Sequence, residues 1–95
     1  MISINSIAKI LGISAKEAKL RAIRALVYEE LRRVRAEKTS ILLRYGVSDF
    51  NELWRKIEEG IIDDTKAHDD IIRLDYLESR ERELEKLLRE LIKNE

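Results

Sequence analysis

The chain has 95 residues, which is the size of about one domain, so we do not expect two independent cores. Charged residues make up 40% of the sequence and hydrophobic residues 44%, which excludes both a disordered tail and a chain buried in a bilayer. Cysteine is absent, which excludes disulfides, cysteine-ligated metals and thiol nucleophiles.

The net charge is zero, with 19 basic and 19 acidic side chains, but the two halves differ. Residues 1–45 carry ten Lys or Arg and four Glu, whereas residues 46–95 carry nine Lys or Arg and fifteen Asp or Glu. A basic half suits phosphate or an acidic partner, and an acidic half suits a basic partner. The alternative is that both sets are solvated faces that attract each other within the fold.

Three isolated glycines divide the chain into four segments with helical periodicity: Gly12, Gly46 and Gly60. The first segment predicts a short helix over residues 5–11, which Gly12 ends in the left-handed conformation. Ser14 and Glu17 then form the Ser-x-x-Glu capping box of a long helix that reaches about Arg44.

The long helix carries one apolar stripe at spacings of three and four: Leu20, Ile23, Val27, Leu31, Val34, Ile41 and Tyr45. Lys38 interrupts this stripe. A helix of about 30 residues is ~45 Å long, which exceeds the width of a compact protein of this size, so it needs a partner along its length. The first half of this helix carries four alanines, which either let another backbone approach closely or serve simply as helix formers: Ala15, Ala18, Ala22 and Ala25.

Ser48 is the predicted N-cap of a short third helix that Gly60 ends. This helix holds Phe50 and Trp54, the only Phe and Trp of the chain. We expect the two rings either in the core between the long helices or as an anchor for a binding partner.

The last helix is predicted from about Asp63 to about Lys93, with a coiled-coil-like stripe that Glu81 interrupts. The stripe consists of Ile71, Leu74, Leu77, Leu84, Leu88 and Leu91. Two long helices joined by a short helical corner predict a single all-α domain over residues 1–95, folded as an antiparallel hairpin. A hairpin alone leaves much of both apolar stripes exposed to solvent, so we expect a homodimer or a hetero-complex.

Acidic residues surround the single histidine, His68, near the start of this helix: Asp63, Asp64, Asp69, Asp70 and Asp75. Asp64 and His68 share a helix face, but no second set of ligands accompanies them, so we expect no metal and no cofactor. The carboxylates are then either a solvated helix start or a surface for a basic partner. Without a glycine-rich phosphate loop or a nucleophile constellation, we do not expect an enzyme.

The segment Ile7-Ala8-Lys9-Ile10-Leu11-Gly12-Ile13-Ser14 resembles the turn of a helix-turn-helix unit, because a small residue, a turn glycine and a polar-capped basic helix follow in order. Its candidate DNA-binding residues are Lys16, Lys19, Arg21 and Arg24. A supporting helix normally precedes such a pair, and only a few residues do so here. Residues 11–17 also resemble the end of a ribbon-helix-helix unit, for which Ile2 and Ile4 would have to supply the ribbon.

The segments Tyr45-Gly46-Val47-Ser48-Asp49-Phe50-Asn51-Glu52-Leu53 and Ile57-Glu58-Glu59-Gly60, followed by an acidic helix, resemble small prokaryotic antitoxins of type II toxin–antitoxin pairs. The resemblance covers roughly residues 40–90. It implies direct neutralisation of a toxin by the acidic half, with an N-terminal part that binds the operator. The candidate partner-binding residues are Tyr45, Phe50, Trp54, Asp63, Asp64, Asp69, Asp70 and Tyr76.

The first functional expectation is therefore an antitoxin-like interaction protein. The alternatives are a DNA-binding regulator that acts through the basic N-terminal helices, and a structural helical dimer module. The start of the chain has no basic targeting segment, and no apolar run approaches the ~20 residues of a membrane span, so we expect a cytoplasmic protein. Abundant Lys, Glu and Arg with little Asn and no Gln are typical of a thermophile.

Overall fold

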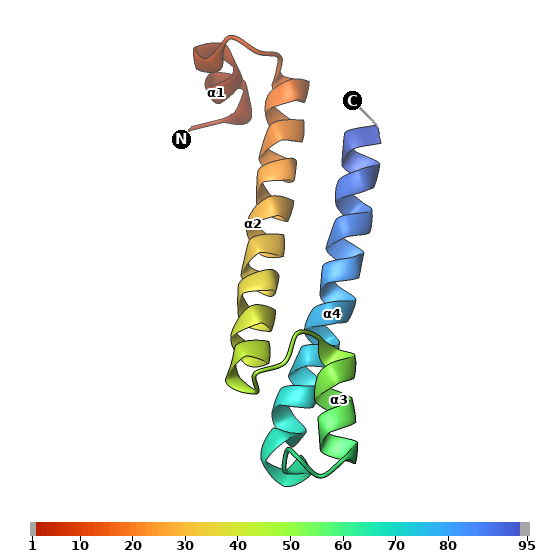
Figure 1. Cartoon of the computed structure of the whole chain (residues 1–95). Coiled ribbons are helices and arrows are strands. Elements are labelled where there is room, and N and C mark those ends of the chain that lie inside the picture. Colours follow the sequence, from red (N-terminus) through yellow and green to blue (C-terminus); the bar gives the residue numbers. More distant parts are fainter. Residues whose placement is uncertain (1, 94–95) are drawn as a thin grey trace.

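The computed structural model describes residues 2–93, which form four helices and no strand: α1 (Ile4–Leu11), α2 (Ala15–Arg44), α3 (Phe50–Glu58) and α4 (Asp64–Lys93). α2 and α4 run antiparallel, α1 packs at the start of α2 on the side away from α4, and α3 lies beside the start of α4 (Figure 1). The predicted all-α hairpin is confirmed.

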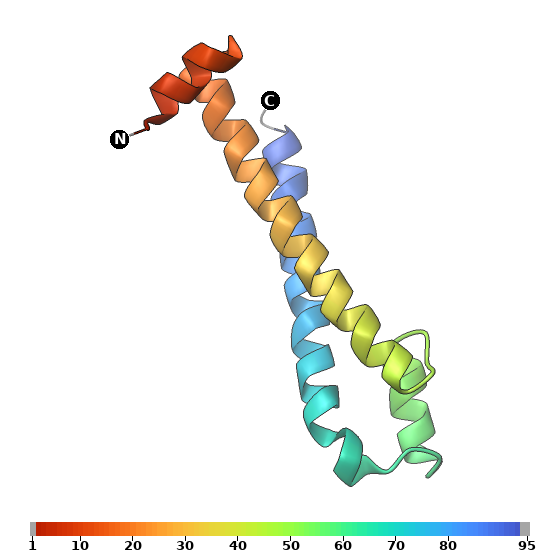
Figure 2. The ribbon, with the colours of Figure 1, turned by 90° about the vertical axis from the view of Figure 1, so that its left-hand side faces the viewer.

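The molecule is an elongated rod. Its principal extents are 60 × 28 × 17 Å and its radius of gyration is 19.1 Å, whereas a compact chain of this length has a radius of gyration of about 12 Å. The two long helices cross along the rod (Figure 2). Within residues 2–93, no helix combines the length and the apolar character needed to cross a bilayer.

Side-chain caps begin the first three helices, because the first backbone N–H groups of a helix have no partner inside it. Ser14 Oγ accepts a hydrogen bond from Glu17 N at 3.0 Å, as predicted. The predicted N-cap of α3, Ser48, is wrong. Asp49 caps this helix instead, because its Oδ1 accepts from Glu52 N at 2.7 Å while Glu52 Oε2 accepts from Ser48 N at 2.8 Å.

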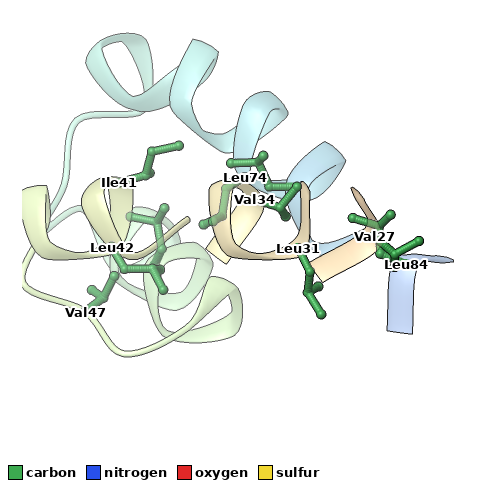
Figure 3. Close-up of a cluster of buried hydrophobic side chains, with 10 residues drawn as sticks. Val27, Leu31, Val34, Ile41, Leu42, Val47, Leu74 and Leu84 are labelled. Carbon is green, nitrogen blue, oxygen red and sulfur yellow. The ribbon is translucent and has the colours of Figure 1, made fainter. Parts of the chain in front are cut away.

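The core is a narrow seam between α2, α3 and α4 (Figure 3). Ten buried residues form it: Val27, Leu31, Val34, Ile41, Leu42, Val47, Leu53, Leu74, Leu77 and Leu84. Leu53 is 0% exposed, whereas its neighbour Trp54 is 46% exposed. Of the two alternatives for Trp54, the core position is therefore wrong, because α3 turns the face of Leu53 toward α4 and leaves Trp54 exposed.

Lys38 and Glu81, which interrupt the two predicted stripes, lie opposite each other across the seam. Lys38 Nζ lies 2.8 Å from Glu81 Oε1, in a part-buried position. Arg35 Nε donates to Glu81 Oε2 at 3.0 Å. Burial raises the pKa of Glu81, but the hydrogen bonds from Lys38 and Arg35 outweigh burial and leave this pKa below its ordinary value of 4.5.

We expect Glu81→Leu to lower the free energy of unfolding by roughly 1–3 kcal/mol, because it removes the main partner of a part-buried Lys38. A Lys38→Met/Glu81→Leu double variant should recover most of the loss, because no charge then stays without its partner. Urea unfolding followed by circular dichroism measures both effects. Glu90→Leu, on an exposed part of α4, is the control, and equal losses in the single and double variants would contradict the prediction.

We expect acid to destabilise the hairpin through Glu81 and Glu37. The hydrogen bond from Arg73 lowers the pKa of Glu37, so both carboxylates have folded-state pKa values below the ordinary 4.5. Their stabilisation is complete above pH 4.5 and is lost as the pH falls through the lowered values. Urea midpoints should stay level from neutral pH to about pH 5 and then fall, and a Glu37→Gln/Glu81→Gln variant should lose less than the native chain.

Candidate functional site

The hairpin converts the charge split of the sequence into two charged ends of the rod. At one end, the last turns of α4 lie near the first turns of α2, since Ile92 lines the same groove as Ala25 and Tyr28. We call this end, made by residues 9–24 and 86–93, the basic end. Its basic side chains are Lys9, Lys16, Lys19, Arg21, Arg24, Lys86, Arg89 and Lys93, and its acidic side chains are Glu17 and Glu90.

The opposite end, made by residues 45–70, is the acidic end. It carries eight acidic side chains: Asp49, Glu52, Glu58, Glu59, Asp63, Asp64, Asp69 and Asp70. Three basic side chains accompany them: Arg55, Lys56 and Lys66. The two ends of the rod therefore differ in charge more sharply than the two halves of the sequence do.

Between the two ends, charges of α2 and α4 pair with each other. Arg73 Nη2 donates to Glu37 Oε1 at 2.7 Å, and Arg35 Nη2 donates to Glu85 Oε1 at 3.2 Å. The expectation that the two charge sets attract each other within the fold is thus confirmed for the middle of the rod, and the ends keep the surplus.

At the basic end, α1, the Gly12 turn and the start of α2 form a compact two-helix unit. Ala8 is 3% exposed and Ala18 is 6% exposed, because two small side chains lie where the helices pack together. Gly12 adopts φ +72°, a left-handed conformation that glycine takes without a steric cost. The unit has the small residue, the turn glycine and the capped second helix of the predicted helix-turn-helix.

The four candidate DNA-binding residues do not lie on one face. Lys16 and Lys19 are exposed, and within residues 2–93 neither makes a hydrogen bond or an ion pair. Arg21 and Arg24 lie on the opposite flank of α2, where both contact Glu17, at 3.0 Å and 3.7 Å. Helical geometry separates the two pairs because successive residues turn by about 100°.

The basic end also holds three residues that the sequence analysis missed, Lys86, Arg89 and Lys93. All three are exposed on the last turns of α4. In the sequence they are visible as basic residues at the end of an otherwise acidic helix. They can be assigned to the basic end only after the antiparallel hairpin is assumed.

At the acidic end, two of the four candidate aspartates support the fold. Asp70 accepts hydrogen bonds from the hydroxyl of Tyr45 and from Arg44 Nη1, the latter at 3.0 Å. The hydrogen bond to Asp70 raises the pKa of Tyr45, and burial adds to this shift. Asp63 Oδ1 accepts from Thr65 N at 2.9 Å at the start of α4. Asp64 and Asp69 are exposed carboxylates.

The aromatic candidates separate into two places. The rings of Phe50 and Trp54 stack on α3, with centroids 6.4 Å apart and an interplanar angle of 8°. Tyr76 lies farther along α4, where the guanidinium of Arg73 sits 5.1 Å from the centre of its ring. Tyr76 is therefore not part of the acidic end.

In the part of the chain that the structure covers, no group of three or more His, Asp or Glu side chains is placed to hold a metal ion. His68 is exposed on α4. The two charged ends present surplus charge and exposed apolar side chains, among them the indole of Trp54 at the acidic end.

The sequence of the chain matches a known protein family. The sequence model of the "Uncharacterized protein MJ0235 family" matches residues 1–95. The chain is 31% identical over 72 residues to "Uncharacterized protein MJ0235" of Methanocaldococcus jannaschii, which covers 76% of this chain and 88% of that relative. No solved structure matches the chain.

We expect neighbouring residues of α3 to respond differently to truncation. Leu53→Ala should lower the free energy of unfolding by about 2–5 kcal/mol, because it opens a cavity in the seam. Trp54→Ala should cost about 1 kcal/mol or less, because it removes mainly an exposed stacking interaction. Chemical unfolding followed by circular dichroism measures both, and a larger loss for Trp54→Ala would contradict the placement of α3.

Proposed function

The chain belongs to the MJ0235 family, and we propose that its basic end binds DNA. The observation that carries the proposal is the α1–Gly12–α2 unit, which has the small residue, the turn glycine and the capped second helix of a helix-turn-helix, and which leaves Lys16 and Lys19 exposed and unpaired within residues 2–93. A second helix that begins at a polar cap, with exposed cations in its first turns, is the element that such units insert into the major groove.

The surrounding charge supports the same proposal. Backbone N–H groups at the start of α2 and its positive dipole end favour a phosphate there. Lys86, Arg89 and Lys93 on α4 extend the positive surface beyond α2, so they suit binding to the phosphate backbone. In this arrangement Lys16 and Lys19 enter the groove, and the α4 cations set the position of the protein on the duplex.

We expect Lys16→Ala/Lys19→Ala to weaken binding of a labelled duplex, taken from upstream of the protein's own coding sequence, by roughly tenfold or more. The slope of log K against log salt should become shallower by about 0.9 for each phosphate that the variant no longer neutralises. Fluorescence anisotropy at several salt concentrations measures both quantities.

The matched control is Lys56→Ala/Lys66→Ala, which removes the same charge from the acidic end. It should leave the affinity within about twofold of the native value if binding is local to the basic end. Equal losses in the two variants, or no binding by the native chain at low salt, would remove the proposed function.

A second candidate function is antitoxin-like binding of a small basic protein at the acidic end. The observation that favours it is Trp54, which is 46% exposed and stacks on Phe50 at the end that also exposes carboxylates such as Asp64. Exposed tryptophan is a frequent anchor of protein interfaces, and surrounding carboxylates favour a basic partner. The resemblance to type II antitoxins supplies the class of partner, a toxin.

Co-expression with the product of the adjacent gene tests this second candidate. We expect a stable complex that Trp54→Ala disrupts and that Tyr76→Ala leaves intact, because Tyr76 lies outside the acidic end. Absence of a complex with any adjacent small protein, or equal effects of the two variants, would count against toxin binding. The two candidate functions use opposite ends, so each result stands without the other.

A further inference from the structure

A second stripe runs along α2 on the side away from α4, and the hairpin leaves it uncovered. Its residues alternate spacings of four and three, and we call it the outer stripe: Ala22, Leu26, Glu29, Arg33, Ala36, Ser40 and Leu43. Leu26 is 71% exposed and Leu43 is 74% exposed. α1 packs on the beginning of the same side, where Ala18 is buried (Figure 1).

We infer that the outer stripe is the interface of a homodimer in which two copies of α2 pack antiparallel about a two-fold axis. A repeat of four and three residues is the spacing that lets one helix pack along another. In the register centred on residue 31, Leu26 lies opposite the partner's Ala36, so a large side chain meets a small one. Ala22 then lies opposite the partner's Ser40, which lets the backbones approach.

Charge complementarity identifies a second copy as the occupant. Within one chain, Arg33 Nε lies 3.4 Å from Glu29 Oε1. In the antiparallel register centred on residue 31, Glu29 faces the partner's Arg33, and Arg33 faces the partner's Glu29. The same two residues therefore complement themselves in both directions, as a two-fold interface requires. A parallel pair of α2 helices would instead place like charges together, which is unfavourable.

The charges also select between antiparallel registers. A shift by one heptad would place Leu26 opposite the partner's Leu43, but Glu29 and Arg33 would then face the partner's Ser40 and the partner's Ala36, which carry no charge. In the charge-paired register, the partner's Leu43 instead lies level with Lys19 at the start of α2. α1 packs there and exposes apolar side chains such as Leu11, which is 62% exposed.

Size-exclusion chromatography with light scattering on the full chain at about 100 μM tests the interface. We expect twice the chain mass of 11.2 kDa for the native protein. We expect a monomer, or at least a tenfold weaker dimer, for Leu26→Asp. A native chain that stays monomeric at this concentration would overturn the inference.

Charge reversal keeps the test decisive if Leu26→Asp does not fold. The Glu29→Arg chain carries two cations on the outer stripe and the Arg33→Glu chain carries two carboxylates, so each should dimerise at least tenfold more weakly alone. Mixing the two chains should restore a dimer of one copy of each, because opposite charges then face each other in the antiparallel register. The matched controls are Glu90→Arg and Arg82→Glu, exposed positions on α4 that should leave dimerisation unchanged.

Disulfide trapping tests the register, since the native chain has no cysteine. Ala22→Cys mixed with Ser40→Cys should give a cross-linked dimer of one chain of each kind. Ala22→Cys alone should not cross-link, because its two copies would lie about 27 Å apart along the helix axes. Unimpaired dimers in both charge-reversal variants, or efficient cross-linking of Ala22→Cys alone, would overturn this interface.

The DNA experiment separates the two failures. A dimer with the expected cross-links that binds no DNA would remove the proposed function and leave the interface. A monomer that binds DNA would remove the interface and leave the proposed function.

Discussion

The structure depends on how α2 and α4 are aligned along their seam, and the Lys38–Glu81 pair is the interaction that selects this alignment. Leucine and valine packing is not directional, so apolar stripes alone tolerate a slide by one heptad. A part-buried pair at 2.8 Å does not tolerate it, because a slide would leave both charges in the seam without a partner. The same alignment places the last turns of α4 beside the first turns of α2, and so it creates the basic end.

The charged residues therefore have two roles. In the middle of the rod they link the two long helices, as Arg73 and Glu37 do, and their charges largely cancel. At the ends, surplus charge of one sign is exposed, and this surplus is what a partner meets first in solution. Because the two charged ends lie at opposite ends of a hairpin 60 Å in extent, the two functions proposed above use separate surfaces.

Because the core is narrow, the sides of the rod, like its ends, expose surface that a partner could contact. A two-helix seam buries one stripe of each long helix and leaves the rest of each surface in water. On α2 the remaining surface includes Leu26 and Leu43, which are 71% and 74% exposed. A second copy packed on this side would bury both residues and widen the structure from a seam to a four-helix layer.

Local interactions made much of this fold predictable from the sequence, because helix periodicity, left-handed glycines and side-chain caps depend on neighbours within a few residues. On this basis the four helices, the hairpin and the turn at Gly12 were determined by the sequence itself. Only the tertiary structure decided the rotation of α3, which buries Leu53 and exposes Trp54, the use of Asp70 within the fold, and the arrival of Lys93 at the basic end. These features depend on which residues far apart in the chain come together, and that is set by packing along the seam.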